Sequence, residues 1–104
     1  MIFERENIKG YKSLIQVDEQ ELHDLFDSLE YGDTIPIDTE TTGIDPYIES
    51  VLLVSFKIKE RVFVIDWTKT QFDFEYYSKK YDLIWLAHNA KFVRKVHNKT
   101  FIRI

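Results

Sequence analysis

With 104 residues, 44% of them hydrophobic and 15% aromatic, the chain can form one packed domain, residues 1–104, and not two. The absence of cysteine excludes disulfides and cysteine-based zinc sites, and with no apolar run of about 18 residues and no secretory signal we expect a cytoplasmic protein without a membrane span. A formal net charge of −4 argues against indiscriminate binding to nucleic acids, whose phosphates are also negative.

The first predicted elements are a strand and a helix. Residues 11–17 have the composition of a short strand, and a helix follows with Asp18 as its N-cap and Glu21 in the capping-box position. The apolar residues of this helix recur at helical spacing: Leu22, Leu25, Phe26 and Leu29. His23 lies off that stripe, so we expect it to be solvated.

Three strands are predicted next, at residues 35–39, 51–58 and 61–67. The second and third are separated only by Lys59 and Glu60, a spacing that predicts an antiparallel hairpin.

The last part of the chain predicts a helix around residues 72–80, a strand at 82–87 and a further helix that starts at Asn89. The strand is almost entirely apolar, which is typical of a strand covered on both faces. The predicted order is strand, helix, three strands, helix, strand, helix. This order indicates the α/β class with a mixed sheet and flanking helices.

Polar side chains follow two of the predicted strands. Asp38 is at the end of one strand, and His88 and Asn89 follow the end of another. Ligands of such sheets bind at the carboxyl ends of parallel strands. If the two strands are neighbours, we expect these three side chains around one crevice.

Asp38 and Glu40 are separated by one residue, so on an extended chain they point to the same side. Two carboxylates at one place repel each other unless a cation lies between them, and Mg²⁺ or Mn²⁺ prefers oxygen ligands. Thr41 and Thr42 offer hydroxyls and amides to a nucleotide. An isolated pair of this kind is also common at an ordinary strand end on a protein surface.

Two longer strings carry a resemblance to a known family. "IDTETTGIDP" (residues 37–46) and "LAHNAKF" (residues 86–92) resemble the first and second motifs of the DEDD, or DnaQ-like, 3′–5′ exonucleases. The strings look most like the proofreading domains of family A DNA polymerases, and the resemblance covers residues 11–96. It implies a ribonuclease H-like fold and two-metal hydrolysis of the 3′-terminal phosphodiester of single-stranded DNA.

The resemblance also implies roles for individual residues. Asp38 would bridge both metal ions, and Glu40 would bind one of them and orient the attacking water. The terminal nucleotide and its backbone would be held by Thr41, Thr42, Ile44, His88 and Asn89. Phe92 would be structural, because it fixes its helix on the sheet.

Two departures from the family pattern leave the activity of this chain open. Val93 occupies the position of the second-motif Asp, and the third motif is absent. Asp38 and Glu40 are two of four expected carboxylates, so we expect weak binding of one Mg²⁺ or Mn²⁺. Asp45, Asp66 and Asp82 are the nearest substitutes in sequence, and we expect none of them to serve.

Two alternatives to an enzyme remain. Residues 88–104 hold five basic residues and no acid, whereas residues 18–49 hold eleven acids and no Lys or Arg. An inactive domain could bind a single strand or its 3′ end through Asn89 and three cations: Lys91, Arg94 and Lys95. The same cations would also suit a solvated helix face. Since the family's sheet continues further, we expect a C-terminally truncated domain, with a homodimer or a missing C-terminal partner covering the strand at 82–87.

Overall fold

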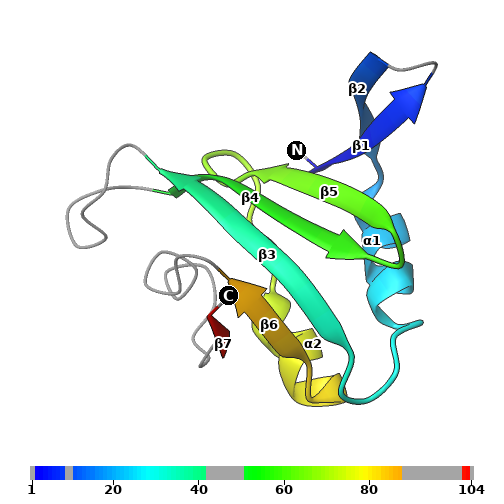
Figure 1. Ribbon diagram of the computed structural model, residues 1–104, viewed down its shortest axis with the longest axis vertical. Helices are drawn as coiled ribbons and strands as arrows, with labels where there is room; N and C mark the ends of the chain where they lie inside the picture. Colours follow the sequence, from blue (N-terminus) through cyan, green and yellow to red (C-terminus); the bar gives the residue numbers. More distant parts are fainter. Residues whose placement is uncertain (1, 9–10, 42–50, 88–101, 104) are drawn as a thin grey trace.

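The computed structural model describes residues 2–8, 11–41, 51–87 and 102–103, which form one mixed sheet with two helices (Figure 1). In chain order the elements are β1 (Ile2–Ile8), β2 (Tyr11–Val17), α1 (Glu19–Phe26), β3 (Thr34–Thr41), β4 (Val51–Ile58), β5 (Arg61–Asp66), α2 (Phe74–Tyr81), β6 (Ile84–Ala87) and β7 (Ile102–Arg103). The strand order across the sheet is β2-β1-β5-β4-β3-β6-β7. The expected α/β class with a mixed sheet is confirmed.

The antiparallel half of the sheet contains the predicted hairpin. β4 and β5 pair from Leu53 opposite Asp66 to Ile58 opposite Arg61. The two turn residues have positive φ angles, 50° for Lys59 and 66° for Glu60. This is the backbone of the two-residue turn that matches the twist of the flanking strands.

The parallel half joins the two strands on which the sequence motifs lie. β3 and β6 pair in parallel, from Thr34 opposite Ile84 to Ile37 opposite Ala87. The end of β6 at Ala87 lies opposite Ile37, one residue before Asp38, and β3 continues to Thr41, so the two strands are neighbours as the crevice hypothesis requires. β7 pairs in parallel with β6 on its other side.

Helix α1 begins where the sequence predicts. The Asp18 side chain caps it by accepting a hydrogen bond from the Gln20 amide at 2.9 Å. The carboxylate of Glu21, expected in a capping box, instead accepts a hydrogen bond from Arg61 at 2.8 Å. None of the helices in the described ranges is long and apolar enough to span a bilayer.

Helices α1 and α2 pack against the same face of the sheet through an aromatic core. The ring of Phe26 on α1 lies 5.9 Å from that of Phe56 on β4. On α2, Phe74 lies 5.2 Å from the Phe56 ring and 5.5 Å from Trp85 of β6. The described residues of this core are almost entirely inaccessible to solvent, so it fixes both helices on one face.

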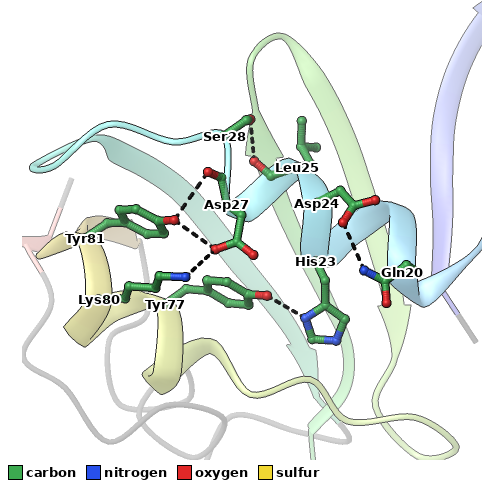
Figure 2. Close-up of polar contacts among 9 residues, drawn as sticks. All are labelled: Gln20, His23, Asp24, Leu25, Asp27, Ser28, Tyr77, Lys80 and Tyr81. Carbon is green, nitrogen blue, oxygen red and sulfur yellow. Dashed lines mark hydrogen bonds and ion pairs between the residues drawn. The ribbon is translucent and has the colours of Figure 1, made fainter.

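A row of polar contacts joins the two helices where they face each other (Figure 2). His23 Nδ1 lies 2.6 Å from the Tyr77 hydroxyl, and its ring centroid lies 4.8 Å from that of Phe72. The expectation that His23 is simply solvated is therefore wrong, because α2 supplies its partner. Further along, Lys80 and Tyr81 both donate to Asp27 Oδ1, at 2.7 and 2.8 Å, and lower the pKa of that carboxyl.

Two elements differ from the sequence prediction, and a third predicted element cannot be compared with the described structure. Strand β1 was not predicted, because its central residues are charged; it is held in the sheet by β2 and β5. Helix α2 extends to Tyr81, and Asp82 ends it in a left-handed conformation rather than starting the next strand. The helix expected from Asn89 lies outside the described residues.

One face of the described sheet carries no helix. Along β6, Trp85 and Ala87 are buried, whereas Ile84 is 38% exposed and Leu86 is half-buried. One face of this apolar strand is therefore only partly covered, as expected for a truncated domain. We refer to this surface as the open face.

Candidate functional site

Strand β3 presents Asp38 and Glu40 on the open face. Ile37 is buried and Thr39 is half-buried on the helix side, while Asp38 and Glu40 are exposed. This alternation is the geometry that the sequence spacing predicts. Both carboxylates thus stand near the carboxyl end of β3, beside the end of the parallel strand β6.

Local backbone geometry orients the two carboxylates. Asp38 Oδ1 accepts a hydrogen bond from the Thr39 amide at 2.9 Å, which holds the side chain against its own strand. The pairing of β3 with β4 changes register between Glu40 and Thr41. Such irregularities bend a strand and change the direction of the side chains beside them.

The remaining predicted site residues are only partly placed. The backbone of Thr41 is paired with Val51 at the end of β3. His88 and Asn89 follow directly after Ala87 in the chain. These two and the other predicted residues of the site lie outside the described residues: Thr42, Ile44, Lys91, Phe92, Val93, Arg94 and Lys95.

A third carboxylate reaches the same edge of the open face. Glu40 is paired with Leu53, and Leu53 with Asp66, so the three residues form one row across three strands. Two strand spacings, about 10 Å, separate the backbones of Glu40 and Asp66, and Asp66 forms no group of three potential metal ligands with Asp38 and Glu40 in the described structure. Asp66 also accepts hydrogen bonds from the hydroxyl and amide of Thr68, at 2.6 and 3.1 Å, and these lower its pKa.

The other two acidic substitutes do not contribute to the described site. Asp82 ends α2, so it lies before β6 rather than at its carboxyl end. Asp45 lies outside the described residues.

The donors in the described structure suit one hard cation and not two. Asp38 and Glu40 supply two carboxylates, and no group of three potential ligands occurs among the residues described. Mg²⁺ is commonly held by one or two carboxylates while it keeps several waters. A pair of ions clamping a phosphodiester needs more ligands than this part of the chain provides.

Below Asp38 the open face is hollowed into a shallow groove of about 270 Å³. Residues of four neighbouring strands line it: Pro36, Ile37, Asp38, Ser55, Phe56, Lys57, Val62 and Leu86. Sequence reasoning missed this groove. The alternation of Ser55 and Lys57 with buried Val54 and Phe56 was a visible signal for the open face, but the groove depends on the cross-strand register.

The chain matches no family model, no curated protein and no solved structure.

Proposed function

We propose that this chain is a 3′–5′ exonuclease-like domain of the kind found in family A DNA polymerases, and that it binds the 3′ end of single-stranded DNA through one divalent cation. The observation that carries the proposal is the position of Asp38 and Glu40. They lie on the same open face, near the carboxyl end of β3 and beside the end of β6. A mixed sheet in which the two motif strands are parallel, with a hairpin between the motifs in sequence, is compatible with a ribonuclease H-like fold.

Asp38 and Glu40 are the residues that would hold the cation. When bound, an Mg²⁺ or Mn²⁺ ion supplies positive charge that attracts a phosphate oxygen. The two carboxylates would hold that ion in place, and the amide of Thr39 steadies Asp38 by donating a hydrogen bond to its Oδ1. Hydrolysis by two metal ions is outside the proposal, because Val93 stands where the resemblance implies a carboxylate and no group of three potential ligands occurs in the described ranges.

The binding of a 5′-fluorescein-labelled oligothymidylate, followed by fluorescence anisotropy with Mn²⁺ or with EDTA, tests this proposal. The test variant is Asp38→Asn with Glu40→Gln. The matched control is Asp24→Asn with Glu19→Gln, which neutralises two exposed acids on α1. We expect Mn²⁺-dependent binding to disappear in the test variant and to persist in the control. Equal affinity in both variants would refute the proposal.

Self-association is a second candidate, favoured by exposed apolar side chains on the open face and on the edge strand β2. Ile84 is 38% exposed, and Leu14 and Ile15 are 55% and 42% exposed. Strand edges with apolar side chains readily pair with other chains. Sedimentation velocity over a hundredfold range of concentration tests this role, and a constant monomer mass would exclude it.

A further inference from the structure

We propose that the groove below Asp38 is a subsite for one nucleotide of the bound strand, with Lys57 contacting a phosphate. This inference rests on the proposed function and adds residues that neither sequence motif includes. The groove volume of about 270 Å³ lies at the lower limit of ordinary small-ligand sites. It has room for the base and sugar of a single nucleotide, not for a longer stretch of strand.

The floor of the groove is a row of side chains across the sheet. Val62 is paired with Lys57, and Pro36 is paired with Leu86. Lys57 and Pro36 each follow or precede a residue of the pair Phe56–Ile37, so they lie next to each other on β4 and β3. The row across the sheet from β5 to β6 is therefore Val62, Lys57, Pro36 and Leu86. Three of them are apolar, and they offer a flat surface for the ring faces of a base or sugar.

A second row lies closer to the carboxyl end of β3. Asp38 is paired there with Ser55. Two residues of strand separate this row from that of Lys57, a distance of about 7 Å. A cation at Asp38 and the ammonium of Lys57 would thus present two positive charges from neighbouring rows of the same groove.

Lys57 is available for such a contact. Its Nζ lies 3.1 Å from a carboxylate oxygen of Glu60, and the two side chains are 43% and 89% exposed. Exposed ion pairs of this kind contribute little free energy. A phosphate can therefore replace Glu60 as the partner of Lys57 without a large penalty.

The groove favours a nucleotide over a purely apolar ligand because two charged side chains, Asp38 and Lys57, line it beside the apolar ones. Without a cation, the Asp38 carboxylate repels phosphate, so occupation of the groove should depend on Mn²⁺. With the cation, a metal-bound phosphate at Asp38 would lie beside the neighbouring row, which holds Lys57 together with the apolar side chains of Val62 and Pro36. A nucleotide at the 3′ end of a single strand presents both phosphate and ring faces to these two rows.

The test measures the affinity of 5′-fluorescein-labelled hexathymidylate for the full chain in Mn²⁺ at several salt concentrations. The variant is Lys57→Gln, and the matched control is Lys79→Gln. Lys79 also forms an exposed ion pair at 3.1 Å, with Glu75, but it lies on α2. A further variant, Val62→Thr, makes the floor more polar at almost constant shape.

We expect Lys57→Gln to weaken binding about three- to tenfold and to reduce the slope of log affinity against log salt by about 0.7, the value for one phosphate contact on a single strand. Val62→Thr should weaken binding without changing that slope, and Lys79→Gln should change neither quantity. Equal behaviour of Lys57→Gln and Lys79→Gln would overturn the subsite.

The variant Asp38→Asn separates this inference from the proposed function. If it abolishes Mn²⁺-dependent binding while Lys57→Gln has no effect, only the groove assignment fails. If Asp38→Asn has no effect, or the native chain binds no oligonucleotide, the proposed function fails and the subsite with it.

Discussion

Replacing Arg61 with Met tests whether the ion pairs of this side chain hold β1, β5 and α1 together. The guanidinium donates to both carboxylate oxygens of Glu4, at 2.9 and 2.8 Å, and to Glu21 at 2.8 Å. The Glu4 side chain is only 15% exposed, whereas that of Glu21 is 51% exposed. Arg61→Met keeps most of the aliphatic length and leaves Glu4 half-buried without a counter-charge.

The expected loss of stability lies between two known limits. Exposed pairs contribute about 0–1 kcal/mol, and removing one partner of a fully buried pair costs about 3–5 kcal/mol. Since Arg61 is 35% exposed and Glu4 is 15% exposed, we expect a loss of about 2 kcal/mol, which corresponds to roughly 8 °C or more in Tm. Urea denaturation at pH 7 measures this loss, and Glu21→Gln should cost less than about 0.5 kcal/mol.

The pH dependence gives a second check. The hydrogen bonds from Arg61 lower the pKa of Glu4 below its ordinary value of 4.5. The stabilisation by the Arg61–Glu4 pair is therefore complete above the ordinary pKa of Glu4. It is lost as the pH falls through the lowered pKa that Glu4 has in the folded protein. The cost of Arg61→Met should shrink at acidic pH, and Glu4→Gln combined with Arg61→Met should recover about half of it at pH 7. If Arg61→Met lowers the free energy of unfolding by less than about 0.5 kcal/mol at pH 7, this reasoning is refuted. An equal loss at pH 7 and at acidic pH would refute it as well.

Three further substitutions should change the free energy of unfolding measured in urea. Thr39→Val should stabilise by about 1 kcal/mol, because Thr39 Oγ1 is buried without a partner among the described residues. Glu60→Gly should stabilise by about 0.5 kcal/mol, because Glu60 adopts a φ of 66° in the turn. Ser78→Ala should destabilise by about 1–2 kcal/mol, because buried Ser78 accepts a hydrogen bond from Trp85 Nε1 at 2.6 Å.

Each of these expectations can fail separately. A destabilised Thr39→Val variant would mean that the hydroxyl has a partner. Loss of stability in Glu60→Gly would mean that the exposed pair with Lys57 outweighs the backbone strain. An unchanged Ser78→Ala variant would mean that Trp85 finds another acceptor.

The sequence predicts the elements whose signals are local. The Asp18 side chain caps α1 by accepting a hydrogen bond from the amide of Gln20, two residues further along the chain. Lys59 and Glu60 form the short turn between two strands that are rich in residues with high β-propensity. The common direction of Asp38 and Glu40 follows from the two-residue period of a strand. These features need no knowledge of distant residues, so their prediction succeeds.

Features that depend on distant partners were missed. Strand β1 carries charged residues that suggest a loop, and its Glu4 is stabilised by Arg61, a residue far along the chain. His23 is paired with Tyr77 of the second helix. Neither contact can be read from a short window of sequence.

The candidate site likewise has some features that the sequence predicts and others that depend on distant residues. The sequence predicts the two carboxylates and the two strands beside them. It does so because the first motif begins within one apolar strand and the second begins within another. The groove could not, because it requires the register of four strands: β5, β4, β3 and β6.

The most direct test of the central claim is a titration of the chain with Mn²⁺, followed by electron paramagnetic resonance, which distinguishes bound from free ion. The proposed function predicts one bound Mn²⁺ per chain, which is lost when Asp38→Asn is combined with Glu40→Gln and retained when Asp24→Asn is combined with Glu19→Gln. Failure to bind Mn²⁺, or binding that survives the first pair of substitutions, would contradict the claim that Asp38 and Glu40 form a metal site.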